Sequence, residues 1–302
     1  MPERFAVDDP WGDDLHLALY CCYELHYRSF AGVGDGWEWH PPLLAFRAGL
    51  EEPFEAALRQ RCDARRLRSD VDVVAALGSL AEAEGPSLST YLATRGTLRQ
   101  FREFVVHRSP YQLKEADPHT WAIPRLEGAP KAAVIQVQME EYGDGVEATM
   151  HSTLFADTMA ELLLDPTYGR YLDFVPGTTL ATTNLISMCG LHRRLRGALV
   201  GHLALFEMTS VGPMGRYSAA LERFGASTRA RRFYDVHIEA DEAHAEVAAH
   251  QMAGRLAVEQ PRLAADIVFG AEAANLVEGR FAAAVLEAWE AGHSSLRAPL
   301  GC

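Results

Sequence analysis

Residues 233–244 read Phe233-Tyr-Asp-Val-His-Ile-Glu-Ala-Asp-Glu-Ala-His244, a helical pattern that carries side chains able to bind a metal. His237, Asp241 and His244 stand at positions i, i+4 and i+7, which lie within roughly 60° of one another on one helix face. The two histidines are about 10.5 Å apart along the helix axis. This separation is awkward for one metal ion and suits two ions with Asp241 between them. The spacing therefore predicts a dinuclear centre.

The kind of metal follows from the ligand types. Imidazoles mixed with carboxylates favour iron or manganese, and open coordination positions on such sites allow ferrous iron to activate dioxygen. Two alternatives remain at this point. A mononuclear site would use only His237 and Asp241, with His244 structural, and a purely solvated acidic face would bind no metal. Ferritin-like carboxylate proteins carry Glu-x-x-His motifs on two helices, and the sequence has no such pair of motifs, which disfavours that fold.

Further ligands must come from other helices. Glu207 lies in the apolar stretch Gly201-His-Leu-Ala-Leu-Phe-Glu-Met, and a buried carboxylate needs a partner. A metal would serve, but nearby arginines compete for this role, and two histidines compete as ligands. The competing residues are Arg193, Arg194, Arg196, His192 and His202.

Another pair of candidates spans a glycine-rich break. Glu141 and His151 are ten residues apart, with Gly143 and Gly145 between them, so the helix is expected to be interrupted there. Spacing alone does not exclude the neighbouring Glu140 and Glu147 as metal ligands.

Helical periodicity dominates the rest of the chain, and strand signals are scarce. The loop at residues 116–130 holds three prolines, which do not continue a helix interior. The expected helices are 13–31, 47–67, 71–84, 88–107, 132–164 with its glycine break, 178–206, 215–224, 230–257 and 271–292. A boundary near residue 108 would separate an N-terminal helical region, 1–107, from a metal-bearing domain, 108–302.

Composition narrows the class of protein. The chain has 302 residues, of which 48% are hydrophobic and 23% charged, as in a globular protein. A net charge of −13 without any basic cluster argues against a nucleic-acid partner. We expect a cytoplasmic protein with no membrane segment, because no leader pattern or long apolar run is present. The five cysteines form no CxxC motif and are expected to be reduced thiols.

Several motifs in order along residues 108–250 resemble one family. They are Arg108-Ser-Pro-Tyr-Gln-Leu-Lys-Glu-Ala-Asp-Pro, Pro124-Arg-Leu, Gln138-Met-Glu-Glu-Tyr-Gly-Asp-Gly, His151-Ser-Thr-Leu-Phe, Glu207, and Phe233-Tyr-x-x-His-x-x-x-Asp-x-x-His. Together they resemble the haem-oxygenase-like diiron oxidases, and within that family the branch of iron-containing redox enzymes, which includes the diiron domain of an N-nitrosating biosynthetic enzyme. The resemblance implies an all-α, haem-oxygenase-like helical bundle with an N-terminal helical extension that contributes to a homodimer.

The resemblance also implies a ligand set and cofactors. The metal ligands would be Glu115, Glu141, His151, Glu207, His237, Asp241 and His244. They would bind two Fe(II) ions per chain, which react with O2. We expect one iron on Glu115, His151 and His244, the other on Glu141, His237 and Asp241, and Glu207 between them. The sequence has no nucleotide-binding glycine motif, so an external reductase or reductant would supply electrons.

The reaction expected from this resemblance is N-oxygenation of an amine or an amino-acid-derived substrate. Glu141 favours it, because the family members that oxygenate amine nitrogens resemble this chain in having this additional carboxylate, whereas the members that lack it include enzymes that cleave carbon–carbon bonds. Carbon–carbon cleavage, desaturation or decarboxylation of an amino acid or fatty acid is the alternative. Arg125 and the arginines at 193–196 are candidates for binding a substrate carboxylate, but structural ion pairs explain them equally well.

Two alternative interpretations of the sequence, each a different class of protein, stay open. A haem- or cofactor-binding helical protein without oxygenase activity would use His151 or His237 as an axial ligand. A structural or interaction protein would leave the polar helix face solvated and would bind no stoichiometric metal.

Overall fold

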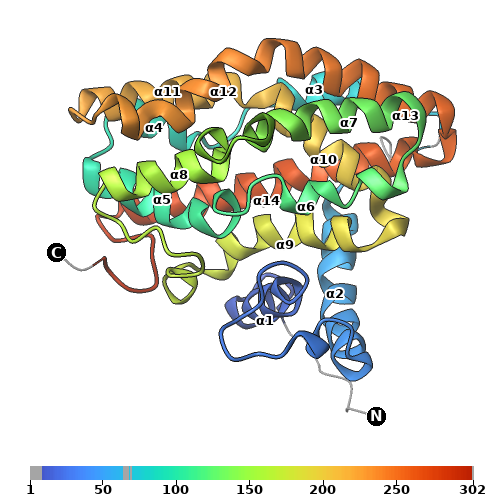
Figure 1. The fold of residues 1–302 in the computed structure, drawn as a ribbon, viewed down its shortest axis with the longest axis horizontal. Coiled ribbons are helices and arrows are strands. Elements are labelled where there is room, and N and C mark those ends of the chain that lie inside the picture. Colours follow the sequence, from blue (N-terminus) through green and yellow to red (C-terminus); the bar gives the residue numbers. More distant parts are fainter. Residues whose placement is uncertain (1–8, 64–67, 69, 301–302) are drawn as a thin grey trace.

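The computed structural model describes residues 9–63, 68 and 70–300, with the backbone alone at 239–243. Within these ranges every regular element is a helix, which confirms the all-helical prediction (Figure 1). The helices are α1 Asp13–Glu24, α2 Pro41–Arg61, α3 Val73–Ala81, α4 Leu88–Thr94, α5 Leu98–Gln112, α6 Asp117–Thr120, α7 Gly128–Glu141, α8 His151–Glu161, α9 Gly177–Leu191, α10 Arg196–Thr209, α11 Val211–Arg223, α12 Thr228–Glu246, α13 Arg255–Glu259 and α14 Ala264–Glu290.

Helices α10 and α14 cross closely within the bundle, while α1 packs against α9 at one side (Figure 1). Two glycines permit the close crossing. A β-carbon on Gly201 would overlap the carbonyl of Ile267, and one on Gly270 would overlap the carbonyl of Ala198. Because backbones meet here without side chains between them, α10 brings Glu207 into the interior of the bundle.

The N-terminal helices share the cores of the later helices. One core combines Leu19 and Phe54 with Leu199 and Phe269, and the other combines Tyr20 with residues such as Phe233. The boundary predicted after residue 107 falls inside α5. The described N-terminal helices α1 to α4 therefore pack against the later helices. A dimerisation role for this region stays a prediction.

Three expected helices are interrupted. The helix expected at 178–206 is divided into α9 and α10 by a 3-10 turn at Arg193–Leu195. The helix expected at 88–107 ends at Thr94, and α5 begins after Thr97, whose side chain forms a capping box with Gln100. A capping box satisfies free backbone donors at a helix start, which explains the new beginning. The helix expected at 230–257 becomes a π-helix at Val247–Gly254, shortly after the His237–His244 stretch. Such π segments are rare and often adjoin functional sites.

None of the described helices combines the length and the apolar character that a bilayer crossing requires. The cysteines in the described part of the chain are free thiols, as predicted: Cys21, Cys22, Cys62 and Cys189. Cys302 lies outside the described residues.

Candidate metal centre

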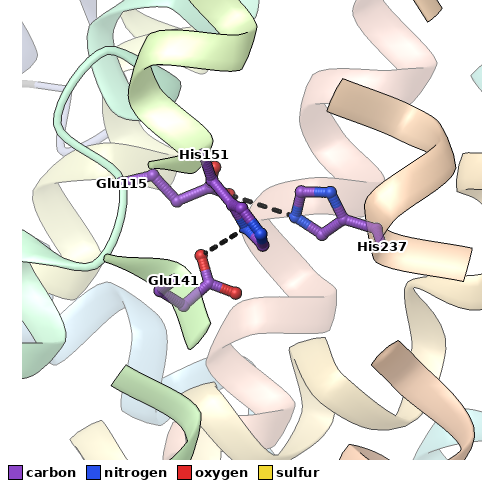
Figure 2. A group of neighbouring side chains, drawn as sticks. All are labelled: Glu115, Glu141, His151 and His237. Carbon is purple, nitrogen blue, oxygen red and sulfur yellow. Dashed lines mark hydrogen bonds and ion pairs between the residues drawn. The ribbon is translucent and has the colours of Figure 1, made fainter. Parts of the chain in front are cut away.

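Four side chains from four segments converge in the interior of the bundle. Glu115 follows α5, Glu141 ends α7, His151 begins α8, and His237 lies in α12 (Figure 2). One ligand atom of each lies within 4.8 Å of the corresponding atoms of the other three, and all four side chains are largely buried. The described chain thus forms a compact group of two carboxylates and two imidazoles.

The backbone after Glu115 holds that side chain in place. Ala116 has φ 72°, a left-handed conformation that is unfavourable for a residue with a β-carbon. The side-chain nitrogen of Gln138 donates to the Ala116 carbonyl at 2.9 Å and stabilises this turn. With its amide oriented to donate, Gln112 reaches the two Glu115 oxygens at 2.6 and 3.2 Å.

A tight turn joins Glu141 to His151, as the glycine break predicted. Gly143, Asp144 and Gly145 all have positive φ. A β-carbon on Gly143 would come within 2.5 Å of the Met150 backbone nitrogen. Only glycine fits there, and the turn brings His151 Nδ1 to 3.0 Å from Glu141 Oε2.

His237 is oriented by its own helix. Its Nδ1 donates to the Phe233 carbonyl at 2.7 Å, which directs Nε2 towards Glu115 Oε1, 3.8 Å away. Its ring centroid is 4.3 Å from that of His151. A backbone carbonyl that fixes one ring nitrogen while the other faces inward is the usual arrangement of a metal-binding histidine.

The charges of these residues balance one another. Burial disfavours the protonated form of His237, but the Glu115 and Glu141 carboxylates outweigh it and raise its pKa to about 10. Burial raises the pKa of Glu115, and the nearby charge of Glu141 adds to this effect. At Glu141 burial also acts to raise the pKa, yet the neighbouring His151 lowers it overall. A proton on His237 thus compensates carboxylate charge in the cluster, and a bound cation would take over this role.

A second group lies around His244. Its Nε2 is 2.7 Å from Glu140 Oε2, and its Nδ1 is 3.3 Å from Glu207 Oε2. Glu207 first, and Glu140 as well, raise the pKa of His244 to about 9 against the effect of burial. The two groups lie close to each other, as the pKa of Glu141 shows: it is lowered by the charges of His151, His237 and also His244.

The structure groups the predicted ligands differently from the expected partition. Glu115 and His151 lie with Glu141 and His237, whereas His244 lies with Glu207. The reason is the turn at Gly143, which folds α8 back so that His151 meets Glu141. Helix α12 runs through Asp241, but the side chain of Asp241 lies outside the described residues.

The first group fits a metal ion. When each ligand bond is about 2.1 Å long, ligand atoms on opposite sides of an ion are about 4.2 Å apart. The ligand atoms of the first group lie within 4.8 Å of one another, which is close to this value. Two carboxylates and two imidazoles are the donor set that suits iron or manganese. In the second group Glu140 and Glu207 lie at different ring nitrogens of His244, so the compact four-ligand group among the described residues is the first one.

The competing candidates have other partners. Arg194 pairs with Glu55 at 2.5 Å, and Arg196 donates to the side chain of Gln260 at 2.9 Å. Arg125 donates to backbone carbonyls at Gly190 and Leu191. His192 Nε2 is 2.8 Å from Glu51 Oε2, and His202 contacts His119. Arg194 is thus held in an ion pair, whereas Arg125 and Arg196 donate to neutral groups. His244 is a partner of Glu207.

Sequence reasoning missed two residues at the site and left a third undecided. Gln112 was not considered, although it stands three residues before Glu115, a spacing that places two side chains on one helix face. Tyr111 was also missed. The carboxylates Glu115, Glu141 and Glu207 contribute, after burial, to raising its pKa well above the usual value. Glu140 stayed undecided, because its role depends on contact with His244, 104 positions further along the chain.

A cavity of about 780 Å³ adjoins the cluster. Its walls include Glu115, Glu141, Glu207 and His237, together with aromatic side chains such as Phe233. This volume is in the usual range for small-molecule sites.

Fold and site together define a helical metalloprotein whose buried carboxylates and imidazoles face a cavity. Within that class, the chain belongs to the haem-oxygenase-like family of iron-containing redox enzymes, whose model matches residues 102–279. Every predicted ligand lies inside the matched segment.

A curated relative adds a more distant comparison. Nitrosourea synthase of Streptomyces achromogenes subsp. streptozoticus is 28% identical over 165 residues, which is 55% of this chain and 35% of that protein. The chain thus corresponds to about a third of the length of this relative. The match supports the family and is a weaker guide to the reaction.

Proposed function

We propose that this chain is a non-haem diiron oxygenase that transfers oxygen from O2 to the nitrogen of an amine or an amino-acid-derived substrate. The observation that carries the proposal is the cluster of Glu115, Glu141, His151 and His237, with all ligand atoms within 4.8 Å. Glu207 and His244 next to it supply donors for a second ion, and Asp241 is included from its position on α12.

Bound Fe(II) would supply the electrons and open coordination positions that O2 activation requires. The protein's own residues hold the ligands and shape the cavity. The Phe233 carbonyl fixes the ring of His237, Gln112 holds Glu115, and buried aromatic side chains limit access of water. N-oxygenation puts one oxygen atom of O2 on the substrate nitrogen and reduces the other to water with two protons. The substrate nitrogen supplies two of the four electrons, and the other two would come from two Fe(II) ions, which an external donor then reduces again.

The distant likeness to nitrosourea synthase favours nitrogen chemistry. Glu141 supports the same choice, because the family resemblance implies an additional carboxylate at this position. One observation speaks against the haem alternative. His151 and His237 lie with ring centroids 4.3 Å apart, and each faces a carboxylate, which suits a small cation better than a porphyrin.

The test is anaerobic Fe(II) titration followed by rapid mixing with O2, for wild type, His237→Ala, His244→Ala and the control His250→Ala. His250 follows on the same helical run, and its side chain is 53% exposed. We expect about two irons per chain and a transient visible absorbance for wild type and for the control. Each ligand variant should bind less iron and lose the absorbance.

Wild type that binds no iron, or ligand variants that behave like the control, would refute the diiron proposal. The reaction type is then decided by product mass with primary amines as substrates. Addition of one oxygen atom supports N-oxygenation, whereas loss of a carbon fragment supports carbon–carbon cleavage.

A further inference from the structure

The cavity beside the metal cluster has a second polar feature, which the proposed chemistry does not use. Along α5 and the following turn, Phe104, Arg108, Tyr111 and Glu115 all line the cavity. Their spacing of three or four residues places them on one side of the helix. Arg108 and Glu115 are separated by roughly 10 Å at 1.5 Å per residue.

Arg108 forms a two-pronged ion pair with Glu278 of α14. Nη1 is 2.9 Å from Oε1, and Nη2 is 2.8 Å from Oε2. The guanidinium also lies over the ring of Phe281, 4.7 Å from its centroid. Both members of the pair line the cavity, so opposite charges are displayed side by side in its wall.

The exposure of this pair separates it from a purely structural one. The side chains of Arg108 and Glu278 are 21% and 24% exposed, and both belong to the cavity lining. The buried pair of Lys114 and Glu24 is only 1% exposed at each side chain. A ligand in the cavity can therefore reach the first pair.

Tyr234 provides an independent sign of a ligand. Its side chain is buried and lines the same cavity, yet its hydroxyl has no hydrogen-bond partner among the described residues. A buried polar group without a partner is costly, and such groups in functional cavities are commonly satisfied by bound molecules. The ring centroid of Tyr217, which also belongs to the cavity wall, lies 5.7 Å from the ring centroid of Tyr234.

We propose that Arg108, Glu278 and Tyr234 form a subsite for a zwitterionic head group, with the ligand's carboxylate on Arg108 and its ammonium on Glu278. The Tyr234 hydroxyl donates to the same head group, and the rest of the ligand extends along α5 towards Glu115. This inference rests on the proposed function, because it assigns residues to substrate binding at the same cavity.

Charge balance selects a zwitterion over a singly charged ligand. A carboxylate alone would compete with Glu278 for the guanidinium and leave one negative charge without a partner in a partly buried wall. An amine alone would compete with Arg108 in the same way. A ligand that carries both charges satisfies both side chains, so little desolvation energy is lost.

The subsite is tested by binding to the full-length, metal-free protein, measured by calorimetry. The probes are L-norleucine, L-phenylalanine and L-lysine, each compared with the amine that lacks its carboxylate and the acid that lacks its α-amino group. We expect at least one amino acid to bind wild type about tenfold more tightly than either analogue. Arg108→Gln should abolish the preference over the amine, and Glu278→Gln the preference over the acid.

Matched variants complete the design. Arg95→Gln removes one member of the exposed Arg95–Glu290 pair and should leave binding unchanged. Tyr234→Phe should weaken amino-acid binding a few-fold. Where a Gln variant does not fold, as judged by circular dichroism, Arg108→Lys and Glu278→Asp replace it. They keep the charge but lose the two-pronged geometry, so they should still reduce the preference.

The inference is overturned when wild type shows no preference for a zwitterion, or when folded variants keep the wild-type preference. Iron uptake and O2 consumption are measured separately. Iron uptake without zwitterion preference would overturn only the subsite, whereas zwitterion preference without iron uptake would overturn only the oxygenase.

Discussion

The Nδ1 atom of His151 lies 3.0 Å from Oε2 of Glu141. The two residues are ten positions apart, and a continuous helix would hold them far from each other, but a non-helical turn at Gly143–Gly145 brings them together. The pair joins the end of α7 to the start of α8 and contributes half of the four-residue cluster. The metal centre therefore depends on the geometry of residues 142–150 as much as on the ligands themselves.

Replacing either member of this pair should weaken iron binding. We expect Glu141→Gln and His151→Ala to lower Fe(II) affinity by at least about tenfold, because each removes a donor from the cluster. Anaerobic titration measures this loss. Glu147→Gln is the control, since Glu147 belongs to the same connection but is exposed. Equal affinities for all four proteins would contradict the assignment.

The turn itself should not tolerate a side chain at Gly143. In Gly143→Ala the new β-carbon would press on the backbone at Thr149 and Met150, and we expect a loss of about 2 kcal/mol or more of unfolding free energy. Gly145→Ala is the matched control. Gly145 also has positive φ but has open space around it, so its cost should be about 1 kcal/mol.

Denaturant unfolding measures both glycine variants, and Fe(II) titration of the folded protein shows whether the turn positions the ligands. Gly143→Ala should bind iron more weakly than Gly145→Ala. The same iron affinity in both variants would show that the ligands do not depend on this turn.

The buried ion pair beside Glu115 should matter for stability. Lys114 Nζ is 2.7 Å from Glu24 Oε2, and Tyr168 donates to both Glu24 oxygens. Glu24→Gln removes the carboxylate that pairs directly with Lys114, which should cost about 3–5 kcal/mol of unfolding free energy.

An exposed pair provides the comparison for Glu24→Gln. Asp70→Asn breaks the Arg68–Asp70 pair, in which both side chains are 68% exposed, and should leave the denaturant midpoint unchanged. Similar midpoints for the two variants would mean that the buried pair contributes no more than a surface pair does.

Acid should destabilise the fold through buried neutral histidines. Burial lowers the pKa of His16 to about 4 and that of His107 to about 3, both from 6.5. The unfolded chain binds these protons more readily, so the stabilising contribution is complete above about pH 6.5. It is lost progressively as the pH falls towards the folded values.

The slope of unfolding free energy against pH between about 4 and 6.5 measures this effect. Each such histidine contributes up to about 1.4 kcal/mol per pH unit. His16→Leu should make the slope shallower, because leucine does not titrate and can pack against Phe54 as the imidazole does. An unchanged slope in His16→Leu would show that His16 is not neutral in the folded protein.

Some of the site could be predicted from local patterns. The spacing of His237 and His244 on one helix, and the glycine break between Glu141 and His151, depend only on helix geometry and on backbone conformations that glycine favours. Which of these ligands lie together in the folded protein could not be predicted from local patterns. His244 contacts Glu140 because α7 packs against the π-helix Val247–Gly254 that follows α12, which is a contact between segments far apart in the sequence.

The amino-acid sequence by itself determined that the protein is helical, where its glycines interrupt the chain, and which side chains are competent metal ligands. These properties depend on residue type and on spacing within a few turns of helix. Only the tertiary structure decided that Glu115 and His237 share a cluster and that Arg108 faces Glu278, 170 residues away. The physical reason is the packing of helices, which brings together side chains whose separation along the chain carries no signal of their contact.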